Sequence, residues 1–297
     1  MKSSTWAHIA LLIANLIYGV NYTVAKGLMP DVIGPNGFIL LRVLGASVLF
    51  LSILLFIRKE KIDRKDYLRL IACAATGVAA NQLLFFNGLS STTPINSAII
   101  MTSNPILVLI MAAIFIGESL NRRKIAGIIL GASGAIWLIS MKGAIRADAP
   151  NINLGNSFIF LNAASYAAYL VLVKPLMKKY KPITVITLVF SIGFFIVLPF
   201  GFAQFGEVNW SGITTNQWLG LAFVVIGTTF LAYLLNIFAI KNVPASTVSS
   251  YIYLQPVFAA LVAIPLGADK LSLTKVLAAM LIFVGVYLVS FKPKSQH

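Results

Sequence analysis

Residues 93–120 read TPINSAIIMTSNPILVLIMAAIFIGESL, and residues 243–271 read VPASTVSSYIYLQPVFAALVAIPLGADKL. Each stretch is long enough to cross a membrane as a helix, and each carries a proline inside an apolar run. Pro105 of the first stretch matches Pro256 of the second, 151 positions later. An internal repeat at this spacing divides the chain into two related halves, so it determines the architecture that we expect.

The composition of the chain is that of an integral membrane protein. Of its 297 residues, 59% are hydrophobic and 10% are charged, whereas a soluble domain carries about 25% charged residues. The formal net charge of +15 would suggest a nucleic-acid partner in a soluble protein. Here the basic residues lie in short connections between apolar runs, so we predict contact with a lipid bilayer and no nucleic-acid partner.

Ten apolar runs are long enough to cross a bilayer as helices. They cover residues 6–26, 35–57, 67–88, 94–117, 123–141, 154–175, 183–203, 216–240, 245–266 and 272–291. The connection 142–153 separates a first repeat, residues 1–141, from a second repeat, residues 154–297. Because five helices per repeat is an odd number, the second repeat enters the membrane from the opposite side. We therefore predict an all-α integral membrane protein of ten transmembrane helices, arranged as two inverted five-helix repeats.

The basic residues also predict the orientation of the chain. Most of the 23 lysine and arginine residues, including those of the segments Arg58–Arg69 and Arg122–Lys124, lie in connections on the side of both termini. Because positively charged connections stay in the cytoplasm, both termini are predicted to be cytoplasmic, in a multi-pass protein of a bacterial inner membrane. The first run is as long as a spanning helix and lacks a small-residue cleavage motif, so we do not expect a cleavable signal peptide.

Acidic and metal-binding residues are absent from the middle of the runs. All eight carboxylates lie at run ends or in connections, which argues against a cation antiporter that uses a buried acid. Cys73 is the single cysteine, and the two histidines, His8 and His297, lie near opposite ends of the chain. No HExxH motif, phosphate loop or catalytic triad pattern is visible. We therefore predict no enzymatic activity, no cofactor and no metal site.

Neutral polar and aromatic residues form stripes at helical spacing on several runs, and the stripes recur in both halves. An isolated polar residue inside a span often joins two helices. Stripes on several helices instead predict a water-filled central cavity. The residues predicted to bind substrate there are Asn15, Tyr18, Tyr22, Asn81, Gln82, Phe85, Ser103, Asn104, Asn162, Tyr166, Tyr169, Tyr233, Asn236, Ser250, Tyr251 and Gln255.

Pro105 and Pro256 are predicted to bend two helices that face the cavity. Each proline removes one helical hydrogen bond, which frees the carbonyls of Met101 and Ile252. A fixed bend that serves packing explains either proline alone. Matched prolines in inverted repeats favour paired hinges or a split binding site at the membrane midplane.

The charged residues near the spans have two interpretations each. Arg42, in the second run, either extends to the outer interface or binds a substrate carboxylate or phosphate. Lys26 and its repeat partner Lys174 either mark the two mouths of a pathway or lie at the membrane interfaces. Glu118 and Asp269 are interpreted as structural caps of the helices that follow them, or as gate latches.

Three glycines predict a close-packing face on the run 123–141. Gly127 and Gly131 are four residues apart, and Gly134 follows three residues later. Small residues at this spacing let two helix backbones approach closely. The partner is either the run 272–291 of the same chain or a second protomer, so a homodimer through these two helices is one expectation.

These features resemble the EamA-type branch of the drug/metabolite transporter superfamily. NPILVLIMAAIFIGESL, residues 104–120, resembles the signature run of that family, and QPVFAALVAIPLGADKL, residues 255–271, resembles its second copy. Arg42 also fits the family pattern, whereas Asp269 stands where a glutamate is usual. The resemblance implies a ten-helix basket whose cavity is lined by helices 1, 3, 4, 6, 8 and 9, with helices 5 and 10 at the periphery.

The function predicted from the residues and the resemblance together is membrane transport. We expect an exporter of small neutral or zwitterionic metabolites such as amino acids, working by alternating access at a central midplane cavity. Proton coupling and facilitated diffusion are both open. An exchanger of nucleotide sugars or phosphorylated metabolites is an alternative, and it requires several basic residues in the cavity. A membrane scaffold or auxiliary subunit without transport activity is another alternative, and it requires a dry, packed centre.

Overall fold

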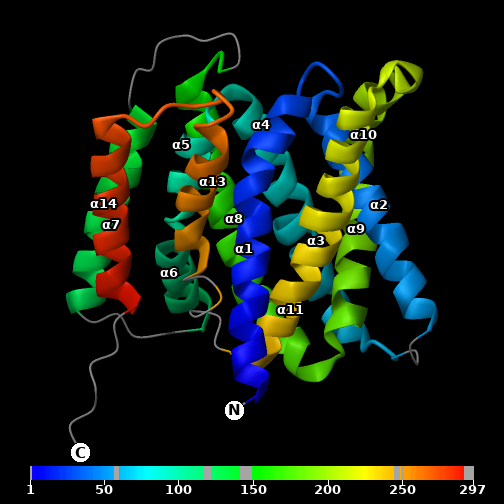
Figure 1. The fold of residues 1–297 in the computed structure, drawn as a ribbon. Coiled ribbons are helices and arrows are strands. Elements are labelled where there is room, and N and C mark those ends of the chain that lie inside the picture. Colours follow the sequence, from blue (N-terminus) through cyan, green and yellow to red (C-terminus); the bar gives the residue numbers. More distant parts are fainter. Residues whose placement is uncertain are drawn as a thin grey trace, which may run out of the picture.

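The computed structural model describes residues 2–56, 60–116, 122–140, 149–243, 248 and 251–290. Within these ranges the chain is helical, without a β-strand, and the helices pack side by side along a common direction (Figure 1). Hydrogen bonds inside each helix satisfy the backbone groups, as the interior of a bilayer requires. The predicted all-α class is therefore confirmed.

Six of the predicted spans are single helices. They are α1 (Lys2–Leu28), α2 (Pro35–Leu55), α7 (Arg122–Ser140), α8 (Ile152–Lys179), α9 (Pro182–Gly206) and α14 (Leu273–Ser290). The other spans are built from consecutive shorter elements. These are η1 (Arg64–Asp66), α3 (Tyr67–Ala74), η2 (Ala75–Ala79) and α4 (Ala80–Ser91); α5 (Pro94–Met101) and α6 (Asn104–Ile116); α10 (Thr215–Ala222), η4 (Phe223–Leu231) and α11 (Ala232–Asn242); and η5 (Tyr251–Leu254) and α13 (Gln255–Ala263).

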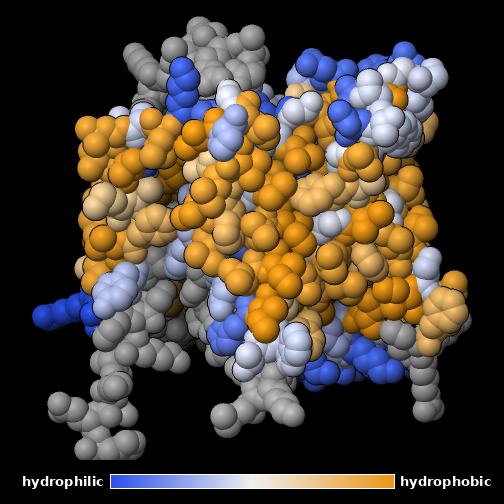
Figure 2. Space-filling view, in the orientation of Figure 1, coloured by the Kyte–Doolittle hydropathy of each residue, from blue (hydrophilic) through white to orange (hydrophobic). Residues whose placement is uncertain are grey.

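Seven helical segments of the described chain are long and apolar enough to cross a membrane. Three shorter apolar helices, at 125–134, 251–263 and 273–285, fall on the remaining predicted runs. Figure 2 shows a hydrophobic band across the visible face, with hydrophilic residues gathered above and below it. This distribution is that of a multi-pass membrane protein. The number of ten spanning helices and the division into two repeats stay predictions.

Two prolines begin helices instead of bending them, which corrects the expectation of one kinked helix in each half. Pro105 is the second residue of α6, and Pro256 is the second residue of α13. The missing N–H of proline is harmless in a first turn, whereas its ring clashes with the preceding turn of a continuous helix. The first span is therefore interrupted by a turn at Thr102 and Ser103, and the second span changes from the 3₁₀ helix η5 to the α-helix α13 directly before Pro256. In the first half, the carbonyl of Ser103 accepts hydrogen bonds from the nitrogens of Ile106 and Leu107.

Two spans that the predicted repeat would relate contain π-helical segments, η2 and η4. The wider turn of η4 lets the hydroxyl of Thr229 donate to the carbonyl of Val224, five residues earlier, at 2.8 Å. π-helical turns are frequent at functional sites because they reorient side chains within a helix. In this protein η4 presents Thr228 and Thr229 to the interior.

Side chains from one half satisfy helix N-termini of the other half. Glu60 accepts hydrogen bonds from the nitrogen of Lys181 at 2.9 Å and the hydroxyl of Thr184 at 2.7 Å, at the start of α9. At the start of α2, Gln204 Oε1 accepts from the nitrogens of Asn36 at 2.8 Å and of the next residue at 3.1 Å. The first N–H groups of a helix have no partner within the helix, so these contacts join the two halves.

Asp269 makes a third contact of this kind. Its Oδ2 accepts from the nitrogen of Ile95, at the start of α5, at 3.0 Å, and its Oδ1 accepts from Lys275 Nζ at 2.7 Å. The expectation that Asp269 caps the following helix was wrong, because Ser272 Oγ accepts the hydrogen bond from the Lys275 nitrogen there, at 3.3 Å. Glu118 lies outside the described residues.

The glycine face of α7 packs against α14 within the same chain (Figure 1). A Cβ atom added to Gly285 of α14 would lie 2.5 Å from the nitrogen of Gly131 and 2.6 Å from the carbonyl oxygen of Gly127. A Cβ added to Gly134 would lie 2.9 Å from the carbonyl oxygen of Ala278. Of the two predicted partners for this face, the structure therefore places the run 272–291 against it.

Candidate functional site

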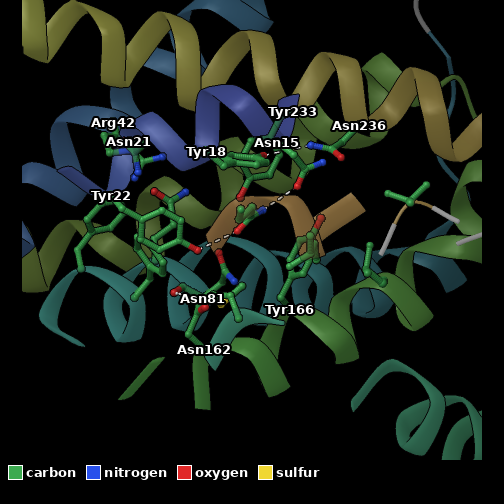
Figure 3. A pocket seen from close by; sticks show the side chains of 18 residues that line it. Asn15, Tyr18, Asn21, Tyr22, Arg42, Asn81, Asn162, Tyr166, Tyr233 and Asn236 are labelled. Carbon is green, nitrogen blue, oxygen red and sulfur yellow. Dashed lines mark hydrogen bonds between the residues drawn. The ribbon is translucent and has the colours of Figure 1, made fainter. Parts of the chain in front are cut away.

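A cavity of about 90 Å³ lies in the centre of the bundle, between elements of both halves (Figure 3). Amide, phenol and aromatic side chains provide most of its surface. Its described lining residues include no carboxylate. They are Asn15, Tyr18, Asn21, Tyr22, Arg42, Asn81, Gln82, Phe85, Phe86, Met101, Asn162, Tyr166, Leu170, Tyr233, Asn236, Val248, Ile252 and Gln255.

A hydrogen-bonded chain joins α1 to the interrupted span of the second half. The hydroxyl of Tyr22 donates to Gln255 Oε1 at 2.8 Å, and Gln255 Nε2 donates to Asn15 Oδ1 at 2.8 Å. Gln255 is the first residue of α13, where the 3₁₀ helix η5 changes to an α-helix, and its side chain is buried in the bundle. The three side chains hold the two helices in register at the edge of the cavity.

Other amides in the cavity wall have unused hydrogen-bonding atoms. Gln82 is 2% exposed, and neither its Oε1 nor its Nε2 has a partner among the described residues. Asn162 donates from Nδ2 to the carbonyl of Asn81 at 2.5 Å, but its Oδ1 has no partner, and neither has Oδ1 of Asn21. A buried polar group without a partner costs about 1–3 kcal/mol. A polar molecule bound in the cavity would supply the missing partners.

Arg42 is buried at the cavity, with 4% of its surface exposed, so it does not extend to the membrane interface. Its Nε donates to Thr229 Oγ1 at 2.8 Å, and its guanidinium lies 4.3 Å from the ring centroid of Phe86. A weaker contact of 3.4 Å joins Nη2 to Thr228 Oγ1. The salt bridges between described residues do not involve Arg42. Within the described part of the chain its positive charge is therefore held by neutral groups only, which leaves it able to bind an anionic group.

The two lysines proposed as pathway mouths do not line the cavity. Lys26 Nζ donates to the carbonyls of Leu89 at 2.7 Å, Ser90 at 3.0 Å and Thr92 at 2.7 Å, at the end of α4. A cation is favourable there because the last carbonyls of a helix lack partners. Lys174 is exposed near the end of α8. Arg42 is thus the one basic residue among the described residues that line the cavity.

Most of the predicted substrate-binding residues meet at this cavity. Those that line it are Asn15, Tyr18, Tyr22, Asn81, Gln82, Phe85, Asn162, Tyr166, Tyr233, Asn236 and Gln255. Tyr18, Tyr166 and Tyr233 come from different helices and face one another in Figure 3. The hydroxyl of Tyr18 also accepts from Asn236 Nδ2 at 3.2 Å.

Four predicted residues lie elsewhere. Asn104 is buried, and its Nδ2 donates to the carbonyl of Ala163 at 2.9 Å, while Ser103 is buried in the turn before α6. Tyr169 packs against the backbone of η2, and Tyr251 Oη contacts His8 Nδ1 at 2.8 Å. Ser250 lies outside the described residues. Ser103 lies in the turn between α5 and α6, and Asn104 is the first residue of α6.

Some residues that line the cavity were not predicted from the sequence. Asn21 follows Tyr18 by three positions, so the helical spacing of the α1 stripe would have identified it. Met101 and Leu170 are apolar residues within apolar runs, which makes them indistinguishable from core residues by pattern. The lining residues that were not predicted are Asn21, Phe86, Met101, Leu170, Val248 and Ile252.

The comparisons with known proteins agree with this architecture. A model of the EamA-like transporter family matches residues 5–140 and 153–291. The uncharacterized transporter YyaM of Bacillus subtilis (strain 168) is 27% identical over 95% of this chain and 93% of its own length. An uncharacterized transporter of Archaeoglobus fulgidus is 26% identical over 100% of both chains. The protein WALLS ARE THIN 1 of Arabidopsis thaliana is 23% identical over 98% of this chain and 84% of its own.

One solved crystal structure has the same fold. It has a TM-score of 0.65 with 15% sequence identity, and the match covers 96% of this chain and 97% of that chain. At this identity the likeness concerns the fold alone. The family match extends over nearly the whole sequence, and the described helices have the length and apolar surface of membrane spans. The chain therefore belongs to the EamA-like transporter family and is a multi-pass membrane transporter of the drug/metabolite superfamily.

Proposed function

We propose that the protein exports small zwitterionic metabolites that carry a carboxylate, such as amino acids. It binds them in the central cavity and moves them across the membrane by alternating access. The observation that carries the proposal is the buried guanidinium of Arg42 without a carboxylate partner among the described residues. Arginine binds carboxylates through charge-assisted hydrogen bonds, and these are stronger inside a low-dielectric cavity than in water.

The remaining cavity groups complement the rest of such a molecule. The free oxygens of Asn162 and Asn21 are acceptors for an ammonium group, and Gln82 provides both a donor and an acceptor. Tyr18, Tyr166 and Phe85 offer aromatic surface to a side chain or a cation. At about 10–15 Å³ for each water-sized position, a cavity of 90 Å³ takes on the order of six to nine non-hydrogen atoms. That is the size of a small amino acid.

The two alternative functions have less support. A nucleotide sugar or a phosphorylated metabolite needs several cations, whereas Lys26 is engaged by carbonyls and Lys174 is exposed. A scaffold without transport activity needs no polar cavity, and the uncompensated amide atoms of Gln82 would then cost stability without benefit.

The experiment compares amino acids with the corresponding amino alcohols, which lack only the carboxylate. The full chain is reconstituted in liposomes, and uptake of each labelled compound is measured for the native protein and for Arg42→Gln. We expect the native protein to prefer the amino acid by at least about tenfold, because a hydrogen-bonded charge contributes about 1.5–3 kcal/mol. Arg42→Gln should remove this preference. Equal transport of acid and alcohol by the native protein would contradict the proposal.

The direction of transport and the orientation of the chain in the membrane are part of the same proposal. Figure 1 places the start of α1 and the end of α14 at the same end of the bundle, which agrees with termini on one side of the membrane. The positively charged connections favour the cytoplasmic side of a bacterial inner membrane. Cells that express the protein should accumulate less of the labelled amino acid than control cells. Reporter fusions at both termini should be active in the cytoplasm; an external C-terminus would contradict this orientation.

A further inference from the structure

A second hollow lies between α5, α13 and α14. Its volume is about 490 Å³, larger than the 90 Å³ of the central cavity. Among the described residues that line it, Lys275 alone has a polar side-chain group. Val257, Leu261 and Met280 line it and are 52%, 66% and 57% exposed. The hollow is therefore a groove open to the outside of the bundle, separate from the central cavity.

The groove lies in the hydrophobic belt and has the length of one membrane leaflet. Figure 2 shows largely hydrophobic colours over α13 and α14. Along α14 the groove extends from Lys275 to Phe283, which is about 12 Å at a rise of 1.5 Å per residue. Half of the hydrocarbon core of a bilayer is about 15 Å thick. A single acyl chain of one leaflet fits this depth.

The polar end of the groove has an ammonium group that is paired with a carboxylate and keeps one N–H donor unused. Lys275 Nζ donates to Asp269 Oδ1 at 2.7 Å and to the carbonyl of Lys270 at 2.9 Å. An ammonium group has three N–H donors, so one donor is left over from these two contacts. Lys275 lies in the first turn of α14, at the end of the bundle where a lipid headgroup would be.

We propose that an acyl chain of a membrane glycerophospholipid occupies this groove, with a phosphate oxygen of the lipid bound to Lys275. The bilayer holds such chains against this surface at all times. Asp269 neutralises the charge of Lys275, so the lipid phosphate is bound through the remaining N–H donor of the ammonium group. An apolar helix from a second copy of the protein would leave the third donor of Lys275 without an acceptor. The groove is thus a specific lipid site and not a part of the general lipid contact.

The position of the groove connects lipid occupancy to the transport site. Pro256 lines the groove, and Gln255, the residue before it, lines the central cavity and bonds to Tyr22 and Asn15. An acyl chain packed against Pro256 therefore supports the first turn of α13. The loss of this lipid should loosen the helix that carries Gln255 and destabilise the protein.

The experiment uses photolabelling of the full chain in nanodiscs. The probe is a phosphatidylethanolamine that carries a diazirine in the middle of one acyl chain, and labelled residues are identified by mass spectrometry. We expect labels to concentrate on groove residues such as Leu261 and Met280, severalfold above belt residues such as Phe195 and Leu219. Equal labelling around the belt would overturn the proposal.

Two variants and a matched control sharpen the result. Ala279→Phe fills the groove, and Met280→Trp covers it from an exposed position. Leu277→Phe, on the same helix but outside the groove, is the control. Labelling of Leu261 should fall severalfold in both groove variants and stay unchanged in the control. Unchanged labelling in Met280→Trp would contradict the site.

Two further measurements separate the lipid from other occupants. A diacylglycerol probe with the same diazirine lacks the phosphate, so it should label the groove less than the phospholipid does. Equal labelling by both probes would contradict the role of Lys275. If cysteines at Leu261 and Met280 instead formed crosslinks between two chains, while the lipid probe stayed away from the groove, a second copy would be the occupant and the proposal would be wrong.

Discussion

The carboxylate of Asp269 accepts a hydrogen bond from the backbone nitrogen of Ile95 at 3.0 Å, so a residue of the second half holds the first turn of α5 in the first half. Asp269 also pairs with Lys275 at 2.7 Å, and the two side chains are 1% and 11% exposed. This junction lies where α5, α13 and α14 meet, at one end of the bundle.

Asp269→Asn should strongly destabilise the protein. The variant leaves the ammonium of Lys275 buried without a counter-charge, and removal of one partner of a buried ion pair costs about 3–5 kcal/mol. The free energy of unfolding in detergent, measured with denaturant, is the readout. Asp63→Asn is the control, because the Asp63 side chain is 61% exposed and its pair with Lys179 is in solvent. Equal destabilisation by both variants would show that burial does not matter here.

Gln82→Met should reduce transport without loss of stability. Both amide atoms of Gln82 are buried and have no partner among the described residues, so an apolar side chain of similar shape removes a desolvation cost in the empty protein. Gln255→Met is the matched control, because the Gln255 amide bonds to Asn15 and Tyr22. We expect the melting temperature to fall for Gln255→Met and to stay level or rise for Gln82→Met. A fall of equal size in both would mean that Gln82 has a structural role.

Pro105→Ala and Pro256→Ala should slow transport while the amount of folded protein stays close to that of the native chain. Alanine is accepted in a first helical turn, but it also permits a continuous α-helix, which would stiffen the turn before α6 or the junction between η5 and α13. Initial rates in liposomes, divided by the folded amount, are the measurement. Pro199→Ala, within α9 and outside the cavity lining, is the control. Native rates in both hinge variants would remove the hinge interpretation.

Gly285→Ala should separate α14 from α7. The added methyl group would lie 2.5 Å from the nitrogen of Gly131, which forces the helix backbones apart and costs about 1–3 kcal/mol, the usual range for overpacking. Gly27→Ala is the control because its new Cβ has no atom within 4 Å. That control should be neutral or stabilising by about 0.5–1 kcal/mol, since alanine favours a helix more than glycine does. Melting temperatures of the two variants in detergent test this difference.

The sequence predicted the broad architecture because membrane spans obey strong local rules. A bilayer requires long apolar segments, and hydropathy alone identifies them. The α1 stripe of Asn15, Tyr18 and Tyr22 was found for the same reason, since helical spacing places residues on one face before any tertiary contact forms. Ser103 and Asn104 were misplaced because they lie where α5 ends and α6 begins, so their direction depends on the turn between the two helices.

The chain's own sequence determined that the protein spans a membrane, that its helices carry inward polar stripes, and that two related prolines mark special positions. Only the tertiary structure decided which side chains meet. Arg42 is held by Thr228 and Thr229 because the π-helical segment η4 turns both hydroxyls inward, and Asp269 binds α5 instead of α14 because distant segments pack together there. Hydrophobicity and helical period are properties of neighbouring residues, whereas a partner for a buried charge is chosen by packing between segments far apart in the chain.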